Sequence, residues 1–395
     1  MTTTPAPDPA SIPFSVDPER TARILLAAAI EPGNIDLGRL IRTHGAITLL
    51  RLLFTDAASL PHTDFAALTR LRDRAVPRLT TEHTTGILQA IRDADLTVIT
   101  PADHCWPHQV NDLGDAAPIV LFARGDHSLL TEPRLTGICG ARAATGYGAY
   151  VATELTEGLV AHGDVIVASG SYGIDADAHR SALTVGGKTI AVLAGGLDRP
   201  YPSGHHDLFD RIVRAGGLLL SEAPPTLAPT RWRFQRRSRL LAALTHRIVI
   251  VEAGARSGTL RLAEYAAKLG TPLGVVPGPL TSAASTGCHL LIRDHGATLV
   301  TGPADVIALE HTNTVTPERS AYPALDSLSA LKADWEDDPH LTPAQRRTLH
   351  ALSDEETQDA LTQAARTVQD AFYALFDSIR SDTTQALLTR HGADT

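Results

Sequence analysis

From residue 96 to about residue 310, short apolar runs alternate with segments whose apolar residues have helical spacing. The runs typical of β-strands are 135–139, 165–168, 189–193, 218–220, 247–251 and 273–276. Helical segments lie between most of them, at 148–162, 176–185, 208–215 and 258–269. Such alternation is typical of βαβ units, so we predict an α/β domain over 93–310 with a Rossmann-like, doubly wound and mostly parallel sheet.

The segments on either side of this region have a different pattern. Residues 18–92 carry apolar residues at helical spacing and predict a small all-helical domain, preceded by a Pro- and Thr-rich, disordered N-terminus over 1–17. A linker at 311–330 precedes a predicted acidic helical tail at 331–395. With 395 residues, the chain is long enough for several domains.

Composition excludes two classes of protein. No apolar run approaches the roughly 18 residues that cross a bilayer, and the N-terminal segment lacks the basic and apolar regions of a signal peptide. Cys105, Cys139 and Cys288 lie far apart and form no CxxC pair, which excludes a disulfide framework and a thiolate zinc site. We therefore expect a cytoplasmic protein with no membrane partner.

The net charge of −9 is unevenly distributed along the chain. Residues 303–395 contain 16 acidic and 7 basic residues, so the remaining 302 residues are neutral in total. Within that neutral part, residues 226–261 contain eight arginines and a single acid, Glu252. This local basic patch suits an anionic partner even though the whole chain is acidic.

The densest part of the patch, residues 231–239 (RWRFQRRSR), interleaves arginines with Trp232 and Phe234. Guanidinium groups neutralise phosphates, and an aromatic ring stacks on an unpaired base for about 1–3 kcal/mol. The stretch therefore suits single-stranded nucleic acid. A solvated surface loop whose aromatic residues anchor it to the core explains the same residues, and the sequence leaves both interpretations open.

Glycine and small or hydroxyl residues follow several predicted strands, at 137–142, 169–171, 195–196 and 257–259. In an open α/β sheet these loops meet at the C-terminal edge of the strands, where helix N-termini attract anions. The loops together predict a phosphate-lined site. None matches GxGxxG in spacing and the sequence has no GxxxxGK[ST], which argues against ATP hydrolysis of the P-loop type.

Two histidine-containing segments allow a catalytic or metal-binding interpretation. Asp175 stands where a helix N-cap is expected and His179 lies one turn later, which fits a catalytic Asp–His pair or a cap with a buried, hydrogen-bonded histidine. We favour the second. His205 and His206, followed by Asp207, have too few neighbouring ligands to predict a metal site.

The motifs and their order resemble those of the DNA-processing protein A family, also called DprA or Smf. The resemblance extends from the helical domain to about residue 308. Its motifs are LTVITPADHCWP (96–107), IVLFARGD (119–126), GAR (140–142), GIDADAHRSAL (173–183), AVLAGGLD (191–198), LSEAP (220–224), FQRRSR (234–239), SGTL (257–260), VPG (276–278) and GA (296–297). Each motif alone is weak, but the ordered series is specific.

The resemblance implies a SAM-like helical domain before the Rossmann-like domain, and a role in binding rather than catalysis. Members of the family bind single-stranded DNA without regard to sequence, form homodimers and deliver the strand to the RecA recombinase during natural transformation or recombination. Carried over by motif, the predicted DNA-binding residues are Arg142, Arg233, Phe234, Arg236, Arg237, Arg239, Ser257, Gly258 and Thr259. We expect no catalytic residue, metal or cofactor.

The chain departs from the family pattern at several positions. Gln235 and Ser238 replace Pro and Asn of the FPxRNR motif, and Ala141 replaces a hydroxyl residue before Arg142. The predicted tail also lacks the strand pair of the winged-helix domain with which many members end.

Two other functions fit the same fold. Cytokinin-activating phosphoribohydrolases of the LOG type use a PGGxGTxxE motif, but Leu262 stands where its glutamate belongs. Glu264 follows two residues later, on what the helical period predicts to be a different face. The other alternative is a sensor module that binds a small phosphorylated nucleotide, which the glycine loops permit.

Overall fold

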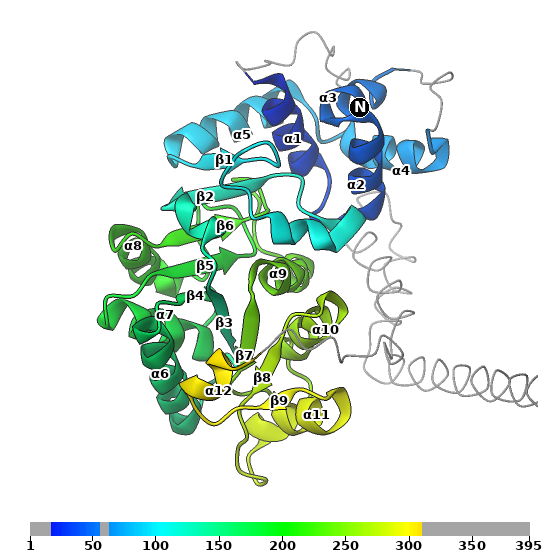
Figure 1. Cartoon of the computed structure of the whole chain (residues 1–395). Coiled ribbons are helices and arrows are strands. Elements are labelled where there is room, and N and C mark those ends of the chain that lie inside the picture. Colours follow the sequence, from blue (N-terminus) through cyan, green and yellow to red (C-terminus); the bar gives the residue numbers. More distant parts are fainter. Residues whose placement is uncertain (1–16, 56–62, 310–395) are drawn as a thin grey trace, which may run out of the picture. The chain divides into compact units, whose positions relative to one another are not determined.

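The computed structural model describes residues 17–55 and 63–309 (Figure 1). The predicted linker at 311–330, the predicted acidic tail at 331–395 and, apart from Asp17, the predicted disordered N-terminus lie outside these residues. Within the described part, none of the helices is both long and apolar enough to cross a membrane.

One nine-stranded sheet runs through the described part of the chain, in the order β1-β2-β6-β5-β4-β3-β7-β8-β9. From β6 to β9 neighbouring strands are parallel, whereas β1 and β2 form an antiparallel edge. The strands are β1 (Thr97–Ile99), β2 (Leu121–Gly125), β3 (Leu135–Cys139), β4 (Val165–Ser169), β5 (Thr189–Leu193), β6 (Leu218–Ser221), β7 (Arg247–Ile250), β8 (Leu273–Val275) and β9 (Thr298–Leu299). The predicted Rossmann-like, doubly wound and mostly parallel sheet is confirmed.

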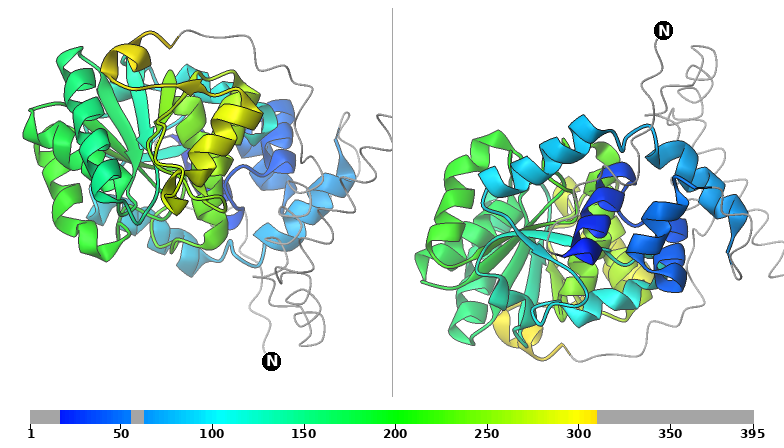
Figure 2. Two further views of the ribbon diagram at one scale, coloured as in Figure 1. Left: turned by 90° about the horizontal axis from the view of Figure 1, so that it is seen from below. Right: turned by 90° about the horizontal axis from the view of Figure 1, so that it is seen from above.

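Helices cover both faces of the sheet (Figures 1 and 2). One face carries α6 (Gly146–Ala161), α7 (Ile174–Thr184) and α8 (His206–Arg214). The other face carries α9 (Arg231–Leu244), α10 (Thr259–Leu269) and α11 (Thr286–His295), and a short helix, α12 (Pro303–Ile307), follows β9. Because both faces are covered, β3, β4 and β5 are buried along their whole length, which explains their continuous apolar runs.

All six predicted strands and all four predicted helices between them are present, with ends shifted by at most two residues. The interpretation of residues 231–239 as a surface loop is wrong, because these residues begin α9. The charge-dense first turns of this helix show no apolar period. Only its C-terminal residues, Leu240 to Leu244, form the buried apolar part that joins it to the core.

Before the sheet, the described chain forms five helices, α1 (Pro18–Ala29), α2 (Ile35–His44), α3 (Ala46–Leu52), α4 (Phe65–Ala75) and α5 (Thr81–Asp93). Four of these helices are capped at the N-terminus by a side chain that accepts a hydrogen bond from the backbone N–H three residues later. The capping residues are Asp17, Asn34, Asp64 and Thr80. One face of α1 packs with α2, α3 and α4. Its other face, with Ile24 and Ala28, packs in a cluster with Phe122 of β2. The helical domain is therefore packed on the sheet.

The strand order creates a crevice beside the central strand, β3, which lies between β4 and β7. The chain moves outward from β3 through β4, β5 and β6, and then returns to the other side of β3 for β7. The connections after β3 and β7 therefore lead to helices on opposite faces of the sheet. Such a switch point, at the C-terminal ends of the strands, is where ligands bind in open α/β sheets.

Candidate nucleic-acid interface

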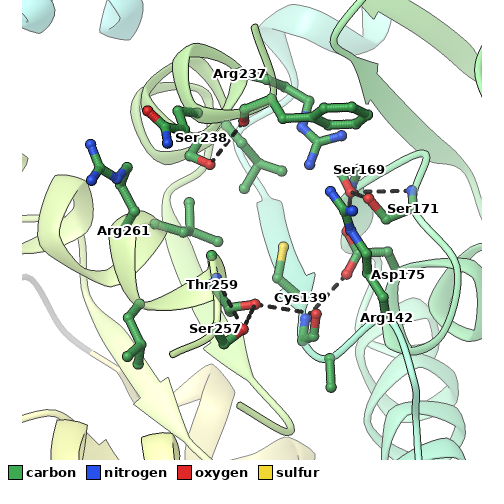
Figure 3. A pocket seen from close by; sticks show the side chains of 18 of the residues that line it. Cys139, Arg142, Ser169, Ser171, Asp175, Arg237, Ser238, Ser257, Thr259 and Arg261 are labelled. Carbon is green, nitrogen blue, oxygen red and sulfur yellow. Dashed lines mark hydrogen bonds between the residues drawn. The ribbon is translucent and has the colours of Figure 1, made fainter. Parts of the chain in front are cut away.

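A cavity of about 890 Å³ opens at this switch point (Figure 3). Five arginines and two acids contribute to its wall, together with small residues from three of the four predicted glycine loops. The lining residues are Cys139, Gly140, Ala141, Arg142, Ser169, Ser171, Asp175, Arg231, Phe234, Gln235, Arg237, Ser238, Leu241, Arg256, Ser257, Gly258, Thr259, Leu260, Arg261, Leu262 and Glu264. The glycine loops and the basic stretch therefore meet in one site.

Helix α9 turns one of its faces to this cavity. The Thr230 side chain caps the helix by accepting a hydrogen bond from the Arg233 N–H at 3.2 Å. The buried leucines at the C-terminal end set the rotation of the helix about its axis. The helical period then places Phe234 and Arg237 on the cavity side.

The ring of Phe234 is within cation–π distance of two cavity arginines. The Cζ atom of Arg142 lies 4.9 Å from the ring centroid, and that of Arg237 lies 5.3 Å from it. Arg142 comes from the loop after β3 and Arg237 from α9, and both point into the same space (Figure 3). This arrangement offers a stacking surface and two phosphate partners side by side.

Arg237 is a cavity cation that the protein leaves incompletely paired. Its Nε atom is buried and has no hydrogen-bond partner among the described residues. Burial lowers the pKa of Arg237 to about 10, against the opposing attraction of Asp175. Because the guanidinium stays protonated at neutral pH, an anion that enters the cavity meets a largely desolvated positive charge.

Asp175 holds the neighbouring loops in place. Its carboxylate accepts hydrogen bonds from the backbone N–H groups of Gly140 (3.1 Å) and Ser169 (3.0 Å), and from the Ser169 hydroxyl. Burial raises the pKa of the Asp175 carboxyl, while these hydrogen bonds act in the opposite direction. The predicted N-cap position of Asp175 is wrong, because Gly173 is the N-cap residue of α7 and Asp175 lies in its first turn.

Two further contacts fix the loop that carries Arg142. Gly173 has φ +74°, and a Cβ atom there would lie 2.3 Å from the carbonyl oxygen of Ala141, so only glycine fits. At the end of the loop, the buried carboxylate of Glu252 accepts hydrogen bonds from the backbone N–H (3.0 Å) and the hydroxyl (2.5 Å) of Thr145. The single acid of the basic stretch is thus a structural residue.

Ser257, Gly258 and Thr259 form another wall of the cavity, at the start of α10 (Figure 3). Ser257 Oγ accepts a hydrogen bond from the Thr259 N–H at 3.2 Å, and Thr259 Oγ1 donates one to the carbonyl oxygen of Gly140 at 3.2 Å. The second bond ties α10 to the loop after β3. The N–H groups of Thr259, Leu260 and Arg261 are bonded to Ser257 and Gly258, so this wall adds hydroxyl groups and small residues to the cavity rather than free N–H groups.

Comparison with known proteins gives the family. The family model described as DNA recombination-mediator protein A matches residues 97–311. A putative DNA processing protein DprA of Mycobacterium tuberculosis is 39% identical over 312 residues, which cover 74% of this chain and 75% of that protein. This chain belongs to the DNA recombination-mediator protein A family. The predicted DprA/Smf membership is confirmed.

Two further relatives of the family agree. The DNA processing protein DprA of Streptococcus pneumoniae is 38% identical over 207 residues, which cover 52% of this chain and 71% of that protein. The X-ray structure of DNA processing protein A from the same species has a TM-score of 0.60 and 31% identity, covering 73% of this chain and 97% of that one. The α/β fold described above is therefore shared with a solved member of the family.

In this family member the structure divides the nine predicted DNA-binding residues into two groups. Those that line the cavity are Arg142, Phe234, Arg237, Ser257, Gly258 and Thr259. Those that do not are Arg233, Arg236 and Arg239. The family motif alone therefore overstates the number of arginines that the cavity presents.

Arg239 and Arg233 are paired with acids away from the cavity. Arg239 is 1% exposed, and its guanidinium lies 2.6 Å from both carboxylate oxygens of Glu222. Arg233 pairs with Glu31, at the end of α1, at 2.6 and 2.9 Å and so joins α9 to the helical domain. Because the protein already neutralises both charges, we withdraw these two residues from the predicted DNA contacts.

Arg236, the neighbour of Arg237 in the chain, stacks on an aromatic ring of its own helix. Its Cζ atom lies 4.0 Å from the centroid of the Trp232 ring, one helical turn earlier on α9. This stacked pair lies outside the set of residues that line the cavity.

The family motifs did not identify several residues of the site. Arg231, Arg256 and Arg261 line the cavity although no family motif assigns them a role. The signal was present in the sequence, because all three belong to the basic stretch at 226–261. Gln235 and Ser238, two departures from the family motif, also line the cavity and add polar side chains to it.

His179 is a buried structural residue, as the favoured interpretation predicted. Its Nδ1 atom lies 2.7 Å from Thr189 Oγ1, and its Nε2 atom lies 3.1 Å from the carbonyl oxygen of Ser169. Burial lowers the pKa of His179 to about 4, so the ring is neutral at pH 7. With both ring nitrogens occupied, the histidine does not form a catalytic pair with Asp175.

The two adjacent histidines after Tyr201 lie in different surroundings. His205 is buried, hydrogen-bonds through Nδ1 to the carbonyl oxygen of Gly170 at 3.0 Å and packs edge-on against Tyr172. His206 is exposed. Among residues 17–55 and 63–309, no three His, Cys, Asp or Glu side chains gather as a metal site.

The cavity wall bears on the phosphoribohydrolase alternative. Leu262, at the position of the missing glutamate, is buried and lines the cavity. Glu264 also lines it, so the expectation that this acid lies on a different face is wrong. Burial raises the pKa of the Cys139 thiol well above its usual value, which argues against a thiolate nucleophile at the cavity floor.

Proposed function

We propose that this protein binds single-stranded DNA, without regard to sequence, in the cavity formed by α9, α10 and the loop after β3. The observation that carries the proposal is the Phe234 ring with the guanidinium groups of Arg142 and Arg237 beside it. The guanidinium groups bind phosphates and the ring stacks on the face of a base. Every nucleotide has a phosphate and a base. Such contacts do not depend on sequence.

The size of the cavity favours a single strand over a duplex. Cavities that enclose drug-sized ligands measure about 300–1,000 Å³, so a cavity of about 890 Å³ suits one or two nucleotides. A base reaches the Phe234 ring only when it is unpaired and unstacked. The same features make the single strand the expected ligand among nucleic acids.

We further propose that the protein acts as a homodimer in the cytoplasm and delivers the bound strand to a RecA-type recombinase, in recombination or natural transformation. Membership of the DNA recombination-mediator protein A family supports this role. The names of its relatives, DNA processing proteins, support DNA as the ligand. The role requires no catalytic group.

Fluorescence anisotropy of a labelled poly-dT oligonucleotide tests the binding, at low and at moderate salt. We expect tight binding by the wild type, an affinity that falls steeply with salt because phosphate contacts dominate, and a loss of at least about tenfold in Arg237→Leu. Absence of binding by the wild type at low salt would overturn the proposal. Displacement of the oligonucleotide by free dTMP at the same nucleotide concentration would instead favour the nucleotide-sensing alternative.

Delivery to the recombinase has its own test. We expect the wild type to accelerate formation of recombinase filaments on DNA coated with single-strand-binding protein, and Arg237→Leu to lose this effect. A wild type that binds DNA but leaves filament formation unchanged would restrict the function to DNA binding. Sedimentation equilibrium of the same samples tests the homodimer.

A further inference from the structure

A second cavity, of about 510 Å³, is lined by Tyr201, whose ring contacts Phe234 of the first cavity. The loop after β5, the start of α8 and the loop between β6 and α9 form its walls. Its chemically distinctive lining residues are Arg124, Arg199, Tyr201, His206 and Thr226. We call it the Tyr201 cavity.

One pair of aromatic rings connects the two cavities. Tyr201 lines the Tyr201 cavity and Phe234 lines the first one. Their ring centroids lie 6.1 Å apart, in an edge-to-face arrangement with 67° between the planes. Tyr201 is 51% exposed, so it remains accessible to a ligand while it contacts Phe234. A strand that leaves the face of Phe234 therefore meets a second accessible ring at once.

The Tyr201 cavity also offers cations for phosphates. The side chain of Arg199 is 90% exposed and lies 3.8 Å from Asp198, a distance too long for a strong ion pair. Arg124 reaches Asp210 at 3.4 Å, but its Nε atom is buried without a partner among the described residues. Asp210 is shared further with His206 and Arg214, at 3.8 and 3.9 Å. These contacts are long, so the guanidinium groups can still donate hydrogen bonds to a phosphate.

The backbone of the rim is strained in a way that binding sites often are. Thr226 has φ +72°, which a β-branched residue rarely adopts. Its N–H donates a hydrogen bond to Asp198 Oδ1 at 2.9 Å, which holds the turn in this conformation. The same carboxylate stands beside Arg199. The rim is thus held in one shape before any ligand arrives.

We propose that the Tyr201 cavity is a second nucleotide subsite, in which the strand bound at Phe234 continues, with one base against the Tyr201 ring and its phosphate beside Arg199 and Arg124. This inference rests on the proposed binding of single-stranded DNA and extends its footprint. Each cavity combines one aromatic ring with arginines, five in the first cavity and two in the Tyr201 cavity. The protein would thus hold successive nucleotides by a repeated pair of contacts, neither of which reads base identity.

The dependence of affinity on ligand length tests the subsite. We compare the full chain with the Arg199→Gln and Tyr201→Leu variants, using labelled dT8 and, as an unlabelled competitor, the mononucleotide dTMP. We expect both variants to bind dT8 about fivefold or more weakly than the wild type and to bind dTMP, which occupies the first cavity alone, with unchanged affinity. Arg199→Gln should also make the salt dependence of dT8 binding less steep by about one phosphate contact.

Matched controls separate the subsite from general effects of charge and of lost aromatic rings. Arg214→Gln removes a positive charge beside Asp210, which also contacts Arg124. The Arg214 side chain is 75% exposed and does not line the cavity. Tyr150→Leu removes an exposed tyrosine from α6, outside both cavities. Both controls should bind dT8 like the wild type. A loss in Arg214→Gln equal to that in Arg199→Gln would overturn the subsite in favour of a diffuse field.

Crosslinking supplies a direct readout. A dT8 strand with a single 5-iodouracil, placed at each position in turn, should crosslink to Phe234 from one position and to Tyr201 from a neighbouring one, as mapped by mass spectrometry. Binding by the wild type with no Tyr201 crosslink, and with both variants equal to the wild type for both ligands, would overturn the subsite alone. No binding by the wild type would overturn the proposed function itself.

Discussion

Two faces of the same helix, α9, carry arginines of opposite character. The face toward the cavity holds Arg237, whose guanidinium is buried and forms no ion pair with a carboxylate of the described residues. The other faces hold Arg239 and Arg233, which are paired with Glu222 and Glu31. Arg237 and Arg239, two positions apart in the chain, thus have different roles. Arg237 is available to a ligand, whereas Arg239 joins parts of the fold. A count of positive charges does not distinguish them.

The difference follows from what surrounds each charge. A buried guanidinium that lies against a carboxylate is neutralised, and separating the pair would leave two desolvated charges. Arg237 has no such close partner, and burial lowers its pKa to about 10. An incoming phosphate supplies the missing partner, so its binding is favoured at Arg237 and not at Arg239.

The largest expected effect is on the free energy of unfolding, at Arg239, one of the paired arginines. Arg239→Leu leaves Glu222 buried without its partner, and we expect it to lower the free energy of unfolding by about 3–5 kcal/mol, as measured by urea denaturation. A double variant, Arg239→Leu with Glu222→Leu, removes both charges and should recover most of the loss. If the double variant retains stability and yet loses affinity for DNA, Arg239 belongs to the binding site after all.

On the cavity side, Arg237→Leu should leave the free energy of unfolding undiminished and weaken poly-dT binding by roughly 1.5–3 kcal/mol, because one charge-assisted contact is lost. The slope of log affinity against log salt should become less negative by about 0.7, as expected for one phosphate on a single strand. Anisotropy titrations at several salt concentrations measure both quantities. A variant that is destabilised but binds normally would reverse the assignment of the two faces.

A substitution at Phe234 tests the contribution of base stacking to DNA affinity separately from that of charge. Phe234→Leu should weaken poly-dT binding by about 1–3 kcal/mol and leave the salt slope unchanged, since no cation is removed. Trp232→Leu is the matched control, because Trp232 lies on α9 outside the cavity. Equal losses in the two variants would show that the binding surface extends over both faces of the helix.

The smallest effect is expected at Arg236, the neighbour of Arg237. Its guanidinium stacks on Trp232 outside the cavity, so Arg236→Gln should change poly-dT affinity by less than about 0.5 kcal/mol. Comparison with Arg237→Leu under identical conditions gives the sharpest test of the two faces. An affinity loss at Arg236 as large as that at Arg237 would contradict the placement of the site in the cavity.

Sequence patterns predicted the sheet well because their signals are local. Strands β3, β4 and β5 are buried on both faces and appear as uninterrupted apolar runs. Helix α9 escaped prediction because arginines occupy most of its first turns, where an apolar stripe would normally show the period. The site was predicted in part, because glycine loops after parallel strands must meet at one edge of the sheet.

Short patterns along the chain are enough to predict the α/β architecture, a phosphate-lined site at the C-terminal edge of the strands and the local concentration of arginines. They do not predict which arginines face a ligand. Arg233 finds its partner Glu31 at a separation of 202 residues, and Arg239 finds Glu222 at a separation of 17. The availability of a charge depends on burial and on the distance to an opposite charge, and both are properties of the folded chain.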